Sequence, residues 1–374
     1  MTTPSFHPPQ RTLMGPGPSD VNPRVLAAMA RPTIGHLDPE FVRMMDEIKE
    51  LLQYAFQTKN ELTLPVSAPG SAGMETCFAN LVEPGAKVLV CINGVFGMRM
   101  VENVKRMGGE AITVNNAWGT PVDVDAVEEA LKAHTDVSVL AFVHAETSTG
   151  VRSDAKALCK LAQDHNCLSI VDTVTSLAGV ELQVDEWGCD AVYSGTQKCL
   201  SCPPGISPIT MSERAVAAIS ARNTPIQSWF QDLSLVMGYW GGGAKRAYHH
   251  TAPVNALYGL HESLVMLQEE GLENSWARHA AMHAMLRDGA QEIGLEFLVD
   301  ESYRLPQLNS ICIPDGVDEA AVRSQLLNDY DLEIGAGLGE LAGKVWRVGL
   351  MGQAAIERNV RLFLDSMKAA LPKN

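Results

Sequence analysis

Lys198 stands at a point in the sequence where covalent chemistry is plausible. It follows a short apolar run, 191–193, and the small polar turn Ser194–Gln197, and Pro203–Gly205 come soon after it. A lysine that forms a Schiff base needs such a place, because it must be held rigidly and face a pocket shielded from water. Desolvation lowers the pKa of its ammonium group and frees the neutral amine. The alternative is an ordinary lysine in a solvent-exposed loop.

A carboxylate ends another apolar strand pattern upstream of this lysine. The run 169–171 stops at Asp172. Pyridoxal 5'-phosphate (PLP) needs a carboxylate beside its pyridine nitrogen, because the protonated ring is the electron sink of its chemistry. Asp172 and Lys198 therefore form a candidate PLP pair. A single aspartate after a strand can equally be a helix cap or a turn residue.

Two further segments carry weaker signals. The small residues Ala68–Gly73 open a helical pattern at 74–82, and backbone N–H groups at a helix N-terminus can hold a phosphate. Many tight turns between a strand and a helix look similar. Arg347 interrupts the apolar strand pattern 345–349, where a guanidinium is costly unless it is paired. A bidentate contact with a substrate carboxylate would explain it, and a structural salt bridge is the alternative.

The elements that must position these residues follow an α/β pattern. Between residues 62 and 210, short β-rich runs alternate with helical patterns, including 123–134 and 154–164. This alternation predicts a mainly parallel sheet, and ligands bind such sheets beyond the carboxyl ends of the strands. The expected strands are 62–66, 87–93, 110–114, 138–144, 168–172, 191–194 and 206–210.

The remainder of the chain predicts a second, smaller α+β domain. Residues 222–250 are expected to be irregular, and a long helical region at 253–293 is expected to break near Gly271. Strands are then expected at 295–299, 310–313 and 345–349, with helices at 318–328 and 355–370. We therefore divide the chain into an N-terminal arm (1–14), a large domain (15–270) and a small domain (271–374).

Composition excludes several classes of protein. The net charge is −15, from 29 basic and 44 acidic residues, which argues against nucleic-acid binding. No apolar run approaches the roughly 20 residues that span a bilayer, and the N-terminus does not resemble a secretory signal. The eight cysteines show no disulfide framework, so we expect reduced thiols in the cytoplasm.

Three motifs suggest other chemistry, but their context argues against it. Gly335–Gly339 is glycine-rich, yet a strand pattern and not a phosphate-binding helix follows it. Cys199 and Cys202 form a CxxC without a second pair at zinc-site spacing. His249 and His250 are adjacent on an extended chain, so their side chains should point apart. We therefore expect no metal site.

The order of these features resembles the class V PLP-dependent aminotransferases, and most closely the alanine–glyoxylate (serine–pyruvate) aminotransferases. The resemblance runs from Gly15 to Gly352. Its sharpest segments are 144–150 (HAETSTG), 171–172 (VD), 193–198 (YSGTQK), 248–251 (YHHT) and 271–274 (GLEN). It implies PLP-dependent transferase fold type I, which is aspartate-aminotransferase-like: a large domain with a mainly parallel mixed sheet, and a smaller C-terminal α+β domain.

The resemblance also implies a role for each matching residue. Lys198 would be the catalytic residue that binds PLP covalently, and Arg347 would bind the substrate carboxylate, with Gly35 also at the substrate. The remaining cofactor contacts would come from Asp172 (pyridine nitrogen), Ser71, Ala72 and Gln197 (phosphate), Phe96 (stacking on the ring), Thr147 (phenolic oxygen) and Val174 (beneath the ring). Tyr248 and Thr251 would reach the phosphate in the neighbouring subunit, so a homodimer with shared active sites is implied. Relatives often carry Trp at the position of Phe96, and either ring offers a face for stacking.

The expected activity is transamination between a small amino acid, alanine or serine, and a 2-oxo acid, glyoxylate or pyruvate, in a ping-pong reaction through pyridoxamine phosphate. A specialised glyoxylate aminotransferase with another donor, such as ureidoglycine, is an alternative. A non-catalytic PLP-binding protein is another, but a simple binder would not need Arg347. A desulfurase needs a mobile cysteine on a late loop, whereas Cys312 lies in an apolar strand pattern.

Overall fold

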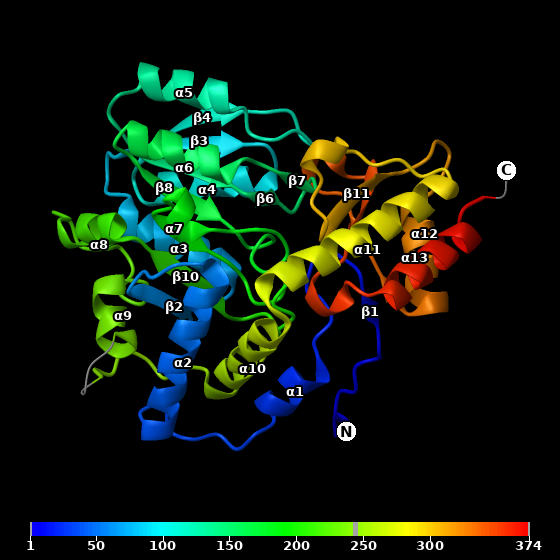
Figure 1. Cartoon of the computed structure of the whole chain (residues 1–374), viewed down its shortest axis with the longest axis horizontal. Coiled ribbons are helices and arrows are strands. Elements are labelled where there is room, and N and C mark those ends of the chain that lie inside the picture. Colours follow the sequence, from blue (N-terminus) through cyan, green and yellow to red (C-terminus); the bar gives the residue numbers. More distant parts are fainter. Residues whose placement is uncertain (1, 242–245, 373–374) are drawn as a thin grey trace.

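The computed structural model describes residues 2–241 and 246–372, which form a larger and a smaller unit side by side (Figure 1). In the described residues, seven strands make the main sheet of the larger unit, in the order β2-β10-β9-β8-β5-β3-β4. Their bounds are β2 (Leu62–Val66), β3 (Lys87–Ile92), β4 (Glu110–Asn115), β5 (Val137–Val143), β8 (Leu168–Asp172), β9 (Ala191–Tyr193) and β10 (Ser207–Met211). Each predicted strand of this region is confirmed to within one residue at either end.

The sheet is mixed and mainly parallel, as the sequence predicts. The strands from β4 to β9 pair in parallel, whereas β10 is antiparallel to both of its neighbours, β9 and β2. β5 buries almost every side chain, which is the pattern of a strand covered on both faces. β2 lies at an edge of the sheet, where its Pro65 is tolerated because an edge strand can spare a backbone donor.

Helices cover both faces of this sheet. From β3 the chain first adds β4 on one side, at the edge of the sheet. It then adds β5, β8 and β9 in turn on the other side of β3. Because crossovers between parallel strands are right-handed, α4 lies on one face, and α5, α6 and α7 lie on the opposite face. α3 packs beside α4, and α5 packs beside α6. The bounds are α3 (Gly70–Leu81), α4 (Val95–Arg106), α5 (Val124–Ala133), α6 (Ala155–Asp164) and α7 (Val184–Trp187).

The smaller unit has its own sheet and apolar core. β11 and β13 both pair antiparallel with β14, and Trp346 and Phe363 are completely buried beside them. β1 (Thr12–Leu13) pairs with β12 (Leu332–Glu333), so the N-terminal arm adds Met14 to this core. The other elements are α11 (Leu272–Glu292), β11 (Leu308–Cys312), α12 (Glu319–Tyr330), β13 (Gly335–Ala336), β14 (Val345–Gly349) and α13 (Glu357–Ala370). The division of the chain at Gly271 remains our proposal.

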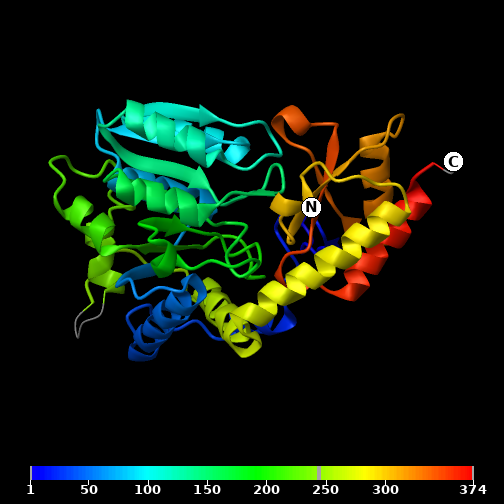
Figure 2. The ribbon, with the colours of Figure 1, turned by 45° about the horizontal axis from the view of Figure 1, so that its top comes forward.

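The long helical region is confirmed, with its break where the sequence predicts it. α10 (Val254–Glu270) and α11 are separated at Gly271, whose φ of 84° favours glycine. Figure 2 shows α11 running from the larger unit to the smaller one. Within the described ranges, no helix has the length and apolar content needed to cross a membrane.

Two predictions about secondary structure are wrong. Residues 295–299 do not form a strand: only Phe297 makes an isolated bridge, to Ile311, because the chain bends directly after it. The segment 222–250 is not irregular throughout, because α9 (Leu233–Trp240) forms with Asp232 as its N-cap. Residues 242–245 of that segment lie outside the described residues. The remaining helices of the larger unit are α1 (Pro23–Met29), α2 (Pro39–Phe56) and α8 (Glu213–Ser220).

Candidate active site

Lys198 is buried beside the N-terminal segment of the chain. Its side chain is 7% exposed, and its Nζ donates a hydrogen bond to the carbonyl of Pro16. Burial lowers the pKa of the Lys198 ammonium to about 8, and the positive charge of Arg347 acts in the same direction. The structure therefore agrees with a desolvated lysine and not with a solvent-exposed one.

Gly17 allows this close approach of the N-terminal segment to the lysine. A Cβ atom on Gly17 would lie 2.8–2.9 Å from the Cδ, Cε and Nζ atoms of Lys198. The φ of Gly17 is also +104°, a backbone conformation that residues with a Cβ rarely adopt. Only glycine therefore fits here without displacing the amine.

Asp172 ends β8 and is held by two hydrogen bonds. Its Oδ2 accepts from the hydroxyl of Tyr193 at 2.7 Å, and its Oδ1 accepts from the backbone N–H of Val174 at 2.8 Å. Burial raises the pKa of the Asp172 carboxyl to about 6, and these two hydrogen bonds and the charge of Lys198 oppose the rise. A cationic nitrogen placed beside it would favour the ionised form further.

Asp172 and Lys198 line one cavity of about 200 Å³. Its other lining residues come from four segments: the beginnings of α3 and α4, the loop after β8, and the end of β9 with the turn that follows it. They are Gly70, Ser71, Met74, Phe96, Arg99, Val174, Tyr193 and Gln197. The structure thus brings six of the sequence-predicted site residues together, namely Ser71, Phe96, Asp172, Val174, Gln197 and Lys198.

Several polar groups at this cavity could bind an anion. α3 begins at Gly70, and its N-cap Pro69 makes no side-chain cap hydrogen bond. Among the described residues the backbone N–H groups of Gly70 and Ser71 have no partner, whereas that of Ala72 donates to the carbonyl of Pro69 at 2.7 Å. In the described part of the chain, the buried Oε1 of Gln197 has no hydrogen-bond partner. Arg99 donates to the Oγ of Ser71 at 3.0 Å, and its guanidinium lies 4.9 Å from the centre of the Phe96 ring.

Arg347 lies on β14, in the smaller unit, and is 6% exposed. Its Nε donates to the carbonyl of Ala336 at 2.8 Å, and its Nη1 donates to the carbonyl of Thr147 at 3.1 Å. Across the residues that the structure describes, no carboxylate forms a salt bridge with it, so the structural salt bridge considered from sequence is absent there. Burial lowers the pKa of Arg347 to about 10, and the charge of Glu146 opposes this effect.

Six predicted residues do not line the cavity of Lys198. Ala72, Thr147 and Arg347 are buried or partly buried, and the other three lie on the surface. Tyr248 and Thr251 are exposed, with their hydroxyl oxygens 3.5 Å apart, and Gly35 is exposed as well. The ring of His36, next to Gly35, lies 5.4 Å from the ring of Tyr248. These residues therefore share one stretch of surface, and their roles stay predictions.

Three residues beside the predicted ones were missed from sequence. Tyr193 holds Asp172, Arg99 lies one helical turn after Phe96, and Glu146 is fully buried close to both Asp172 and Arg347. Burial raises the pKa of the Glu146 carboxyl to about 7, whereas hydrogen bonds from Ser148 lower it. The spacing of Arg99 from Phe96 was a usable signal, because residues three apart share a helix face.

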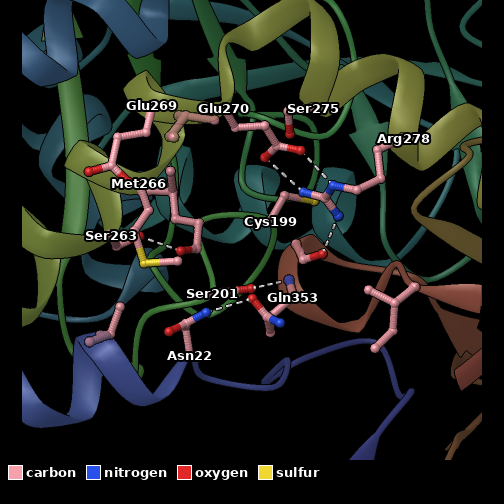
Figure 3. Close-up of a pocket in the computed structure, with 15 residues that line it drawn as sticks. Asn22, Cys199, Ser201, Ser263, Met266, Glu269, Glu270, Ser275, Arg278 and Gln353 are labelled. Atoms are coloured by element: carbon pink, nitrogen blue, oxygen red, sulfur yellow. Dashed lines mark hydrogen bonds and ion pairs between the residues drawn. The ribbon is translucent and has the colours of Figure 1, made fainter. Parts of the chain in front are cut away.

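A second cavity, of about 420 Å³, is lined by Cys199 and Ser201, which come soon after Lys198 in the chain (Figure 3). There the backbone N–H of Gln353 donates to the Oγ of Ser201 at 2.7 Å, and Ser263 donates to the carbonyl of Leu200. Arg278 is already engaged in this cavity, because it pairs with Glu270. These contacts fix the residues directly after the lysine against α10 and the smaller unit.

Comparisons with known proteins agree with this geometry. Residues 19–350 match the family model described as aminotransferase class-V. The chain is 41% identical to alanine–glyoxylate aminotransferase of Rattus norvegicus, over 98% of this chain and 89% of that protein. It is 38% identical to the (S)-ureidoglycine–glyoxylate transaminase of Bacillus subtilis, over 97% of this chain and 91% of that protein.

A solved structure extends the agreement to the whole fold. The crystal structure of an alanine–glyoxylate aminotransferase from Nostoc sp. superimposes with a TM-score of 0.97 at 45% identity. The match covers 100% of this chain and 98% of that one. Both the family match and the fold extend over both units of the molecule. The chain therefore belongs to the class V aminotransferases.

Proposed function

We propose that this aminotransferase carries PLP on Lys198 and exchanges amino groups between alanine or serine and glyoxylate or pyruvate. The main support is the single cavity that a buried lysine of lowered pKa and a strand-end carboxylate both line. The alanine–glyoxylate aminotransferases among the relatives support alanine and glyoxylate as the first pair to test.

The residues of the cavity fit PLP chemically. The N-terminus of α3, with Ser71 and Ala72, would hold the phosphate, and the amide of Gln197 can turn either of its ends toward a ligand. Asp172 would face the pyridine nitrogen, and Phe96 and Val174 would lie against the ring. Thr147, which is buried, would approach the phenolic oxygen. When bound, PLP supplies an electron sink that stabilises negative charge at the substrate Cα.

Lys198 and Asp172 would then have different roles in proton transfer. With its pKa lowered to about 8, the Nζ of Lys198 is neutral in an appreciable fraction of molecules near neutral pH. A neutral Nζ can accept the proton of the substrate Cα. Asp172, kept ionised by Tyr193, would hold a proton on the pyridine nitrogen.

Arg347 would orient the amino acid by its carboxylate. Only some of its N–H groups donate to the carbonyls of Ala336 and Thr147, and the guanidinium has a planar fork that matches a carboxylate. The ureidoglycine–glyoxylate relative makes ureidoglycine a second candidate donor.

We also propose that the active form is a homodimer with shared sites. Trp229 and Tyr248 are 63% and 64% exposed, and Trp229 stacks on His249 with ring centres 4.4 Å apart. Large apolar side chains gathered on a surface are typical of an interface. Tyr248 and Thr251 would then reach the phosphate held by the neighbouring subunit, and Gly35 would lie at its substrate.

A reducing compartment, the cytoplasm, is the environment that we propose. Seven of the eight cysteines are buried, and all eight are free thiols in the described structure. Cys159 and Cys189 have sulfur atoms 3.1 Å apart, which corresponds to a thiol hydrogen bond and not to a disulfide. An oxidising compartment would favour oxidation of these two thiols.

A spectral half-reaction tests the proposed activity. L-alanine added to the PLP-loaded protein should bleach the visible absorbance of bound PLP and release pyruvate, and glyoxylate should restore the band and yield glycine. A Lys198→Ala variant should lose both responses. A protein that binds PLP but shows no response to any of alanine, serine and ureidoglycine would contradict the proposal.

A further inference from the structure

The first turn of α4 is held by side chains that come from outside the helix. Its N-cap is Gly94, which has no side chain to offer. The backbone N–H of Phe96 instead donates to the Oε2 of Glu146 at 3.2 Å, and that of Val95 donates to the Oγ of Ser148 at 3.0 Å. Two of the N–H groups left unpaired at the start of a helix are therefore satisfied by the segment Glu146–Ser148.

Both oxygens of the Glu146 carboxyl act as acceptors. Besides the N–H of Phe96 on Oε2, its Oε1 accepts from the backbone N–H of Ser148 at 2.9 Å and from the hydroxyl of Ser148 at 2.6 Å. Glu146 is completely buried. An amide side chain has only one oxygen, so it could satisfy the donors on one side only.

The packing around this carboxyl leaves no space. A Cβ atom on Gly94 would lie 2.4 Å from the Cδ and Cγ atoms of Glu146 and from the Oγ of Ser148. The φ of Gly94 is 173°, which is extended backbone, so steric contact and not conformation requires glycine there. The position of Glu146 is thereby fixed against the start of α4.

The segment Glu146–Ser148 touches both walls of the active site. On one side it holds the first turn of α4, which carries Phe96 and Arg99 into the cavity. On the other side the carbonyl of Thr147, between the two clamping residues, accepts from Arg347. One short segment therefore sets the stacking ring and the substrate arginine relative to each other.

We propose that Glu146 is a positioning residue, which fixes the ring of Phe96 and the guanidinium of Arg99 for cofactor binding by clamping the first turn of α4. This inference rests on the proposed binding of PLP in the Lys198 cavity. A carboxyl is costly to bury away from water, and apolar residues are the commoner occupants of a protein core. The presence of Glu146 in the core is explained if its carboxyl fixes the direction of α4 and does not mainly stabilise the fold.

The test compares Glu146→Ala and Glu146→Gln with the parent protein. Glu146→Ala should weaken PLP binding at least tenfold in a titration of the apoprotein. It should also change the visible circular dichroism of bound PLP, which reports the orientation of the ring. The PLP affinity of Glu146→Gln should lie between those of the parent protein and Glu146→Ala. Gly94→Ala, whose new methyl group would collide with the same carboxyl, should weaken PLP binding as Glu146→Ala does.

Asp190→Asn is the matched control. Asp190 is another buried carboxyl that holds backbone and side-chain donors, those of Ser169, Ser212 and Arg214, but it lies near the beginning of β8 and β9, away from the cavity. This variant should lower the unfolding temperature and leave PLP affinity and the dichroic band unchanged. An inference limited to general stability would instead predict equal effects from Asp190→Asn and Glu146→Gln.

The outcomes separate this inference from the proposed function. If the parent protein itself fails to bind PLP, the proposed function is wrong. If the parent binds PLP and Glu146→Ala keeps its affinity and its dichroic band, the inference alone is overturned. Should Glu146→Ala not fold, Ser148→Ala takes its place, because it removes the hydroxyl shared by Glu146 and Val95. An unaltered band in that variant would likewise overturn the inference.

Discussion

The hydroxyl of Tyr193 donates a 2.7 Å hydrogen bond to the Oδ2 of Asp172, its direct partner on the neighbouring parallel strand. Paired residues of adjacent strands project from the same face of a sheet, so the register of β8 and β9 makes this contact without any loop. The contact lies in the interior of the molecule, where a hydrogen bond to a charged group is worth more than at the surface. Tyr193 therefore acts on the ionisation of Asp172.

Removing this hydroxyl should raise the pKa of Asp172. A hydrogen bond to a charged group is worth about 1.5–3 kcal/mol, and one pKa unit corresponds to about 1.4 kcal/mol. In Tyr193→Phe, the acid limb of the pH profile of kcat/KM should therefore move to higher pH by about one unit or more. Tyr54→Phe, which removes a hydroxyl that accepts from the backbone N–H of Leu272, should leave the profile in place. Coincident profiles for Tyr193→Phe and the parent would contradict this role.

Substituting Gly17 should act on Lys198 directly. In Gly17→Ala, the new Cβ would collide with the end of the lysine side chain, so we expect PLP to bind at least tenfold more weakly, as measured by absorbance titration. Gly316→Ala separates this clash from backbone strain. Gly316 has a φ of +80°, and no atom of the described residues lies within 4 Å of its Cβ position. The control should lose about 1 kcal/mol of unfolding free energy and keep full PLP affinity.

Replacing Arg347 should affect the substrate and not the cofactor. Arg347→Lys keeps the charge but loses the planar fork, so the KM for alanine should rise about tenfold or more while PLP affinity stays unchanged. Arg323→Lys is the control, because Arg323 pairs with Glu319 within α12 of the smaller unit. Steady-state kinetics with both variants would test the assignment. An unchanged KM for Arg347→Lys would remove Arg347 from the substrate site.

Asp172 and Lys198 could be predicted from sequence because the α/β alternation fixes where strands end. Carboxyl ends of parallel strands meet at one edge of the sheet, so residues at two such ends come together whatever the details of packing. Ser71 follows from the same pattern, since it lies in the first turn of the helix that comes after β2, whereas Gln197, in the turn after β9, was assigned only through the family resemblance. The local signal was therefore enough for the residues nearest the edge of the sheet.

Glu146 and Tyr193 could not be predicted in this way. The partner of Glu146, the N–H of Phe96, lies 50 residues away in the chain, and Tyr193 is buried in a strand, where its sequence pattern suits a core residue. α9 was missed because its apolar run shows no clear polar face. At 295–299, Leu295 and Val299 are buried as the alternation suggests, but the pairing with β11 is limited to one bridge at Phe297, made by backbone hydrogen bonds of Glu296 and Leu298. Burial pattern alone does not specify pairing.

His279 should make the stability of the protein depend on pH. It is completely buried in α11, where its Nδ1 donates to the carbonyl of Ser275 and its Nε2 accepts from the N–H of Gly352 at 2.9 Å. Burial lowers the pKa of this imidazole to about 4, and Arg278 acts in the same direction, while Glu270 opposes it. The neutral ring therefore joins α11 to the loop that follows β14.

The sign of the effect follows from the lowered pKa. Below about pH 6.5 the unfolded chain binds a proton on His279 that the folded protein excludes down to about pH 4, so the free energy of unfolding falls as the pH falls. Between pH 7 and pH 5 this loss should be about 2 kcal/mol. A His279→Gln variant, whose amide can still donate and accept but does not titrate, should escape it. Glu146 and Asp172 have raised pKa values, so they make the free energy of unfolding rise as the pH falls. The measurement is therefore the difference in unfolding free energy between the parent protein and His279→Gln, from denaturant unfolding at each pH. A constant difference from pH 7 to pH 5 would show that His279 does not titrate in this way.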